Sequence, residues 1–125
     1  MNTIVVGYNE TEVSERALAR AGELAGMYGA KLVVTSAVPY MIVDESRGPA
    51  VVDGLADRLS DRGIDADVVS GIGDPAEVIV QVAEKRAADL IVVGTREPSL
   101  IERQLGHSVS EHVQRRAHCD VLIVH

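Results

Sequence analysis

The amino-acid sequence predicts an α/β protein: one doubly wound domain in which a parallel β-sheet is flanked by four helices. Short runs of aliphatic residues alternate along its 125 residues with longer segments whose apolar residues recur every three or four positions. This alternation of strands with amphipathic helices favours a parallel sheet with right-handed crossovers. No linker or internal repeat divides the chain, so we expect residues 1–125 to form a single domain.

Five segments are predicted to be strands. Residues 3–8 and 90–93 are compact aliphatic runs, as expected for strands that are buried on both faces of a sheet. Residues 64–70 alternate apolar and polar side chains, which indicates a half-exposed strand at an edge of the sheet. The remaining two strands are residues 31–38, rich in Val and Thr, and residues 121–124.

The first two helices are delimited by a cap residue and by glycines. Thr11 is a good N-cap for the first helix, and Gly29 ends it. Residues 39–49 contain two prolines and a glycine and are predicted to be a loop, after which a second helix closes at Gly63. The apolar residues of the first helix, expected to face the sheet, are Ala17, Leu18, Ala21, Leu24, Ala25 and Tyr28.

The last two helices begin with strong capping signals. Asp74 is followed by a proline at position 75 and a glutamate at position 77, a pattern that is typical of a helix start. The fourth helix is expected over residues 108–117, with Ser108 as N-cap and Glu111 completing a capping box. A helix N-terminus that faces the end of a parallel strand offers unpaired N–H groups to an anion. The loop between Gly94 and Ser108 is therefore a candidate anion-binding loop.

Candidate binding residues lie where the predicted strands end. Ligands of doubly wound sheets bind at the carboxyl ends of strands where the strand order reverses, commonly beside the first strand. A structural role alone would also explain some of these residues, because Gly94 ends a strand, Ser108 and Ser110 belong to a helix start, and Asn9 favours a turn. The candidates are Gly7, Tyr8, Asn9, Ala37, Val38, Gly94, Thr95, Arg96, Gly106, His107, Ser108, Val109 and Ser110.

The composition argues against several classes of function. A net charge of −7 disfavours nucleic-acid binding. The sequence shows neither a secretory leader nor an apolar run of about 18 residues, so no membrane partner is expected. The single cysteine, Cys119, is expected to be a buried structural thiol in a reducing compartment. These features predict a cytoplasmic protein.

Metal binding and nucleophilic catalysis have little support. The spacings of His107, His112, His118 and His125 do not repeat the three- or four-residue interval that aligns metal ligands on a helix. Ser108 and His112 are four residues apart, so a serine–histidine nucleophile is geometrically allowed, but no nucleophile turn or third orienting group accompanies them. A hydrolase or transferase on this fold remains a third alternative.

Ordered motifs occur at residues 4–9, 14–18, 73–77, 88–94, 108–113 and 119–124. Together they resemble the universal stress protein family. The resemblance implies five parallel strands in the order 3-2-1-4-5. It also implies a homodimer that meets across the final strand, formed by Val121, Leu122, Ile123 and Val124. An aliphatic edge strand is an aggregation hazard unless something pairs with it, which gives the dimer a physical reason.

One branch of that family resembles an ATP-binding module, and this sequence departs from the phosphate loop of that branch. The loop reads Gly, two residues, Gly, nine residues, Gly, then Ser or Thr. Gly94 and Ser108 fit, but Glu97 and His107 occupy the other two glycine positions, and Gly106 is displaced by one residue. The branch also ends its first strand with an acidic residue near the nucleotide, where this chain has Asn9.

Glu97 is the departure expected to weaken ATP binding most. Glycine permits positive φ and a close approach of backbone N–H groups to phosphate, whereas glutamate does neither well. A carboxylate about 5 Å from phosphate costs about 3 kcal/mol at an effective dielectric near 20, or about two powers of ten in affinity. Protonated His107 and Arg96 would offset part of this cost.

The sequence therefore predicts a homodimeric stress-response or regulatory module with a degenerate adenine-nucleotide crevice and no turnover of its own. ATP, ADP or AMP is expected to bind weakly or not at all, and AMP or adenosine is penalised less because it carries fewer phosphate charges. The alternative is a functioning nucleotide sensor. In that case Arg96, His107 and the helix N-terminus at Ser108 hold the phosphates, with slow hydrolysis.

Overall fold

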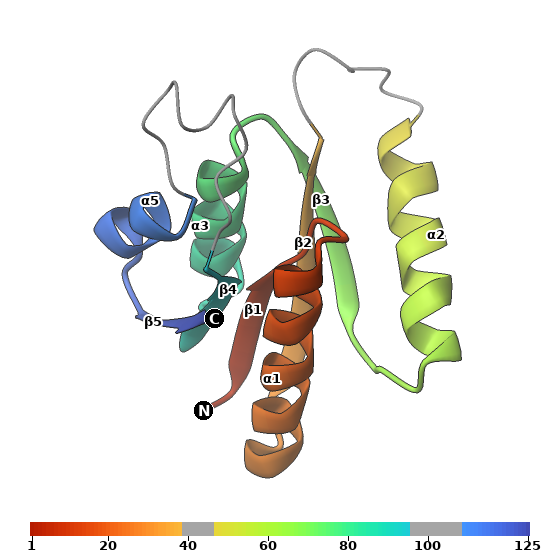
Figure 1. Cartoon of the computed structure of the whole chain (residues 1–125), viewed down its shortest axis with the longest axis horizontal. Coiled ribbons are helices and arrows are strands. Elements are labelled where there is room, and N and C mark those ends of the chain that lie inside the picture. Colours follow the sequence, from red (N-terminus) through yellow and green to blue (C-terminus); the bar gives the residue numbers. More distant parts are fainter. Residues whose placement is uncertain (39–46, 96–108) are drawn as a thin grey trace.

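The computed structural model describes residues 1–38, 47–95 and 109–125, and the side chains of these residues except for Val38 and residues 47–53. In this part of the chain strands and helices alternate, as predicted (Figure 1). The elements are β1 (Thr3–Gly7), α1 (Glu12–Tyr28), β2 (Lys31–Val38), α2 (Arg47–Asp61), β3 (Asp67–Ile72), α3 (Pro75–Lys85), β4 (Leu90–Gly94), α5 (Val109–Arg116) and β5 (Asp120–Val124).

The strands form one parallel sheet in the order β3-β2-β1-β4-β5. This confirms the predicted fold class and the strand order implied by the family resemblance. β1 is the central strand and has β2 and β4 as neighbours, so the strand order reverses beside it. β3 lies at one edge of the sheet, as its alternating sequence indicated, and β5 lies at the other.

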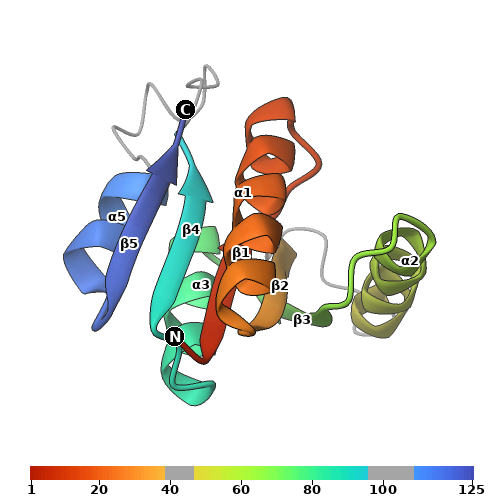
Figure 2. The ribbon, with the colours of Figure 1, turned by 90° about the horizontal axis from the view of Figure 1, so that it is seen from below.

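Two layers of helices cover the sheet (Figure 2). α1 and α2 pack on one face, and α3 and α5 pack on the other. Successive residues of β1 alternate between the two cores, because Ile4 and Val6 face α1 whereas Val5 faces α3. All three side chains are fully buried, which confirms that the first strand is covered on both faces.

Predicted cap residues begin and end the helices. The hydroxyl of Thr11 accepts the N–H of Ser14 at 3.2 Å, and Gly29 ends α1 in the left-handed conformation. Asp74 accepts the N–H of Ala76 at 3.2 Å, with proline at the first position of α3. These two helix starts are therefore confirmed in their geometry.

α3 ends in the same way as α2, with a residue in the left-handed conformation, but this residue is alanine instead of glycine. Gly63, with φ of 75°, follows α2 and lets the chain return hydrogen bonds to the last turn of the helix. Ala87 occupies the equivalent position after α3 with φ of 50°. The N–H of Ala88 bonds to the carbonyl of Ala83 at 2.9 Å, and the N–H of Ala87 bonds to that of Glu84 at 3.2 Å. Ala87 thus holds a conformation that normally favours glycine.

Two predicted boundaries are wrong around α2. The helix begins at Arg47, so the predicted loop is too long by three residues. Pro49 fits there because the first four N–H groups of a helix need no acceptor within it. β3 comprises Asp67–Ile72 instead of residues 64–70, because the N–H of Ile64 is used to close α2 by bonding to the carbonyl of Leu59 at 2.9 Å. The other described strand and helix ends agree with prediction within one residue.

Two side chains are more exposed than predicted. Tyr28 was expected to face the sheet but is 57% exposed. The 17-residue α1 is longer than the five-residue β1 that it covers, so its last turn extends past the amino end of that strand (Figure 1). Cys119 is half-buried instead of fully buried, and this burial raises the pKa of its thiol.

Candidate functional site

The carboxyl ends of β1, β2 and β4 meet at one edge of the sheet, called here the carboxyl edge. Hydrogen bonding continues one residue past two of these strands, because the N–H of Tyr8 bonds to the carbonyl of Thr35 and that of Thr95 to the carbonyl of Val124. The structure thus brings together seven of the predicted binding residues. They are Gly7, Tyr8, Asn9, Ala37, Val38, Gly94 and Thr95.

Two glycines at this edge allow helices to pack closely on the sheet. A Cβ on Gly7 would lie 2.6 Å from Cδ1 of Ile79 in α3. A Cβ on Gly94 would lie 2.9 Å from the carbonyl oxygen of Val13 in the first turn of α1. Both glycines therefore have a packing role, which is independent of the predicted contact with a ligand.

Tyr8 connects the end of β1 to α1 and α2. Its side chain is only 8% exposed and belongs to the core beneath these helices. Its hydroxyl donates a hydrogen bond to Glu15, and Arg62 donates to the other carboxylate oxygen at 3.0 Å. Burial and the bond to Glu15 raise the pKa of Tyr8, whereas the hydrogen bonds from Tyr8 and Arg62 lower the pKa of Glu15.

Asn9 forms the turn between β1 and α1. Its side-chain oxygen accepts the hydroxyl of Thr11 at 2.6 Å and the N–H of Thr11 at 3.3 Å. Its own N–H donates to the hydroxyl of Ser14 at 3.3 Å. The structure therefore accounts for Asn9 as a turn residue, and its contact with a nucleotide stays a prediction.

Three carboxylates at the start of α1 are paired with arginines. Glu12 pairs with Arg16 one turn along the same helix, at 3.3 Å. Glu10 and Glu15 instead pair with arginines at the end of α2. The distances are 2.7 Å for Arg58–Glu10 and 3.0 Å for Arg62–Glu15. Sequence analysis missed these two pairs, although the three glutamates within six residues were a signal that compensating cations are needed.

The remaining predicted site residues belong to the segment before α5 or to the first turn of α5. Arg96, Gly106, His107 and Ser108 lie outside the described residues, as does the capping box that Ser108 was expected to form. Val109 and Ser110 open α5; Val109 packs against the core beneath α3, and Ser110 is buried. The structure thus describes the strand that leads into the predicted loop and the helix that follows it.

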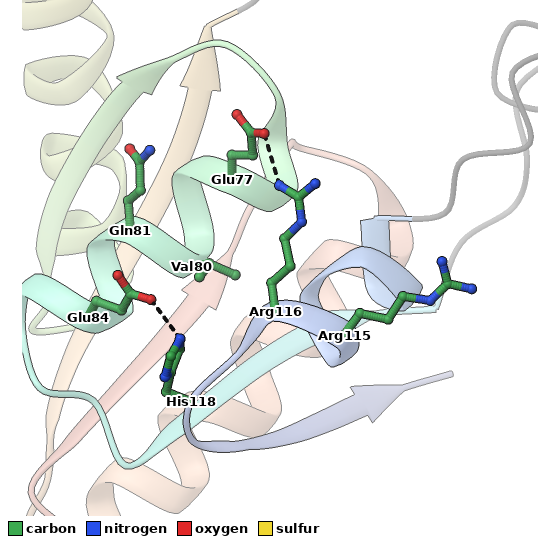
Figure 3. A pocket seen from close by; sticks show the side chains of 7 residues that line it. All are labelled: Glu77, Val80, Gln81, Glu84, Arg115, Arg116 and His118. Atoms are coloured by element: carbon green, nitrogen blue, oxygen red, sulfur yellow. Dashed lines mark hydrogen bonds and ion pairs between the residues drawn. The ribbon is translucent and has the colours of Figure 1, made fainter.

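A separate groove lies between α3 and α5 (Figure 3). Its volume is about 550 Å³, and an adjoining hollow of about 480 Å³ reaches Cys119. Arg116 pairs with Glu77 at 2.9 Å, and His118 contacts Glu84 at 3.2 Å, so both pairs join the α5 side of the groove to α3. None of the predicted binding residues that the structure describes lines this groove. The lining residues of the groove are Glu77, Val80, Gln81, Glu84, Arg115, Arg116 and His118.

The described residues contain no cluster of three or more His, Cys, Asp and Glu side chains suited to a metal ion. Among the helices of the described segments, none is long and apolar enough to cross a membrane.

Comparison with known proteins decides the family. Residues 1–125 match the model of the Universal stress protein family. The chain belongs to this family. It is 35% identical to universal stress protein Rv1636 of Mycobacterium tuberculosis strain H37Rv, over 98% of this chain and 95% of that protein. It is 30% identical to universal stress protein YxiE of Bacillus subtilis, over 98% of each chain. The resemblance identified from sequence motifs is thereby confirmed.

Solved structures of universal stress proteins share the fold. A universal stress protein in complex with cAMP is 31% identical, with a TM-score of 0.74 over 99% of this chain and 97% of that chain. The Rv1636 crystal structure is 35% identical, with a TM-score of 0.58 over 99% of this chain and 94% of that one. UspA from Lactobacillus plantarum is only 18% identical, but its TM-score of 0.79, over 99% of this chain and 97% of that one, shows the same fold.

Proposed function

We propose that this universal stress protein binds an adenine nucleotide of low charge, with cAMP as the leading candidate, at the carboxyl edge between β1 and β4. The observation that carries the proposal is the 31% identity, over nearly the full length of both chains, to a universal stress protein in complex with cAMP. The position agrees with the rule that open α/β sheets bind ligands where the strand order reverses. The protein acts as a regulatory module without turnover.

Charge at the carboxyl edge supports a nucleotide with few phosphate charges. Glu10, Glu12 and Glu15 each have one arginine partner, so these pairs add no net positive charge for a polyphosphate. In the segment after β4, Glu97 adds a further carboxylate, which the neighbouring Arg96 offsets in part. The phosphodiester of cAMP carries a single negative charge, whereas ATP carries several, so ATP meets the larger repulsion.

Calorimetric titration tests the proposal. The purified protein is titrated with cAMP, AMP, ATP and adenosine, with and without magnesium, at moderate and at high salt. Saturable binding of cAMP, with weaker binding of ATP, is the expected result. Binding of ATP tighter than about 100 μM and tighter than that of cAMP overturns the low-charge assignment. Absence of binding for all four compounds overturns nucleotide binding altogether.

The two departures from the ATP-binding loop provide a second test. In the double variant Glu97→Gly, His107→Gly, the glycines of the ATP-binding pattern are restored and one carboxylate is removed. ATP affinity is expected to rise by about tenfold to a hundredfold, with a smaller change for cAMP. Unchanged ATP affinity would contradict the view that these residues exclude polyphosphates.

We further propose a homodimer that forms across β5. β5 is an edge strand, and its four aliphatic residues remain half-exposed in the single chain. An edge of this kind is stabilised when a second copy pairs with it. Light scattering after size-exclusion chromatography tests this directly: a mass of about twice 13.3 kDa is expected. A monomer at micromolar concentration contradicts the dimer.

A further inference from the structure

The start of α1 is a dense cluster of negative charge beside the proposed nucleotide site. Glu10, Glu12 and Glu15 fall within six residues and directly follow Asn9 at the end of β1. Carboxylates in the first turn favour the helix because they interact with its dipole. The same carboxylates repel a phosphate that approaches the carboxyl edge. A protein that binds an anion here must therefore offset them.

The end of α2 supplies two of the offsetting charges. Arg58 lies in the last turn of α2, and Arg62 directly follows the helix. The N–H of Arg62 bonds to the carbonyl of Arg58 at 3.2 Å, so the two residues are one turn apart. Arg58 donates to Glu10 at 2.7 Å. Arg62 approaches both oxygens of Glu15, at 3.0 and 3.5 Å, while the hydroxyl of Tyr8 also donates to this carboxylate. α2 thus reaches back to residues at the carboxyl edge that are 47 and 48 positions earlier in the sequence.

These ion pairs contribute little to stability because they are exposed. The side chains of Arg58 and Glu10 are 58% and 68% exposed, and those of Arg62 and Glu15 are 48% and 37% exposed. Pairs with such exposure are typically worth about 0–1 kcal/mol. These charges also contribute to the local electrostatic potential, because an uncompensated carboxylate acts on an anion over about 10 Å at 0.1 M salt.

We propose that Arg58 and Arg62 determine the charge specificity of the nucleotide site. They neutralise Glu10 and Glu15, so that a nucleotide with a single negative charge is accepted. Because each arginine only balances the charge of its own carboxylate, these two ion pairs carry no net positive charge and do not attract a polyphosphate. This inference rests on the proposed function and adds that specificity resides in α2, outside the strand ends that bind the ligand. Arg58 and Arg62 act through the glutamates and are positioning and compensating residues.

Charge-removing variants test the inference. Arg58→Gln and Arg62→Gln each leave one carboxylate uncompensated, and the dissociation constant for cAMP is expected to rise roughly threefold to tenfold. Adenosine carries no charge, so its affinity should stay within about twofold. The loss for cAMP should shrink in high salt because ions screen the exposed carboxylates. Arg62→Lys retains the charge and should retain most of the affinity for cAMP.

A control for net charge exists at the opposite end of the sheet. Arg86 pairs with Asp67 at 3.0 Å, the same distance as Arg62–Glu15, and has comparable exposure. Asp67 also pairs with Lys31 at 3.0 Å and so keeps one cation when Arg86 is replaced. Arg86→Gln changes the net charge by the same amount far from the carboxyl edge, and cAMP affinity should not change. Circular dichroism and thermal unfolding establish that each variant is folded.

The possible outcomes separate the two proposals. If wild-type protein binds neither cAMP nor adenosine, the proposed function fails and the inference fails with it. If wild-type protein binds both, but Arg58→Gln and Arg62→Gln weaken cAMP and adenosine equally, the inference alone fails. An equal loss of cAMP affinity in Arg86→Gln also overturns it, because a general effect of net charge would then explain the result.

Discussion

The two ends of the central strand β1 use carboxylates in different ways. At the amino end, Asp89 accepts the backbone N–H groups of Asn2 at 2.6 Å and Thr3 at 2.9 Å, which ties β1 to the start of β4. At the carboxyl end, Glu10 and Glu15 instead receive hydrogen bonds from arginine side chains of α2. The same kind of group therefore binds backbone at the start of β1 and side chains after its end.

This difference separates a structural end of the molecule from the end proposed for binding. A carboxylate that accepts backbone N–H groups occupies the donors that an anionic ligand would need. At the carboxyl edge, Gly7 and Gly94 allow the helices to pack closely on the strands. Glu10 and Glu15 pair with arginine side chains there and not with backbone N–H groups. The comparison predicts that substitutions at the two ends affect different measurements.

The largest expected effect is that of Gly94→Ala at the carboxyl edge. The new Cβ would lie 2.9 Å from the oxygen and 3.0 Å from the carbon of the Val13 carbonyl, so the backbone of α1 has to move. The free energy of unfolding should fall by about 2–3 kcal/mol, which chemical denaturation measures. Because α1 shifts with it, cAMP binding should weaken as well.

Gly7→Ala is the matched control for this substitution. Its Cβ would meet Cδ1 of Ile79 at 2.6 Å, which is the terminal atom of a side chain, so no backbone atom of α3 has to move. The expected loss is about 1 kcal/mol. Gly22→Ala within α1 meets nothing within 4 Å and should stabilise by about 0.5–1 kcal/mol. Equal losses for Gly94→Ala and Gly7→Ala would contradict the importance of the Val13 backbone.

The next effect concerns the amino end and depends on pH. Hydrogen bonds from the N–H groups of Thr3 and Asn2 hold the pKa of Asp89 below its ordinary value. The stability from this carboxylate is therefore present above about pH 4 and is lost as pH falls through the pKa of the folded state. Asp89→Asn should be less stable than the wild type at neutral pH, and the difference should shrink as pH falls below about 4 and the Asp89 carboxylate of the wild type becomes protonated.

Denaturant unfolding across this pH range measures the effect of Asp89→Asn. Asp120→Asn removes an exposed carboxylate at the same end of the sheet, at the start of β5, and serves as the control. A constant difference between Asp89→Asn and wild type from acid to neutral pH would show that the charge of Asp89 is not responsible. Binding of cAMP should be unchanged in both variants, since they lie at the amino end.

The fold was predictable because its signals are local. Aliphatic runs such as Leu90–Gly94 and caps such as Thr11 and Asp74 act on their own neighbours. The errors arose where a neighbouring element uses the same residues: Ile64 has β propensity, yet its N–H closes α2. Tyr28 fits the helical period, but its exposure depends on how far the sheet extends beneath α1.

The candidate site was predictable only in part, and for a different reason. The topological rule for parallel sheets gives the strand ends at Gly7 and Gly94 without any side-chain detail. The pairs of Arg58 with Glu10 and Arg62 with Glu15 depend on how α2 packs beside α1, across 48 and 47 positions of sequence. Likewise, the need for glycine at position 94 comes from the backbone of Val13, which no motif reveals.

The smallest expected effect compares two residues with positive φ, one near each end of the sheet. Ala87, with φ of 50°, follows α3 at the amino end, and Glu10, with φ of 64°, follows β1 at the carboxyl end. Glycine relieves about 1 kcal/mol of backbone strain at either position, but part of this is lost to the greater entropy of the unfolded chain. Ala87→Gly should therefore stabilise by about 0.5 kcal/mol, measured by denaturant unfolding.

Glu10→Gly should gain almost no free energy of unfolding, because it also removes the ion pair with Arg58. A clear stabilisation by Glu10→Gly, combined with unchanged cAMP binding, would mean that this glutamate and its arginine have no role at the carboxyl edge.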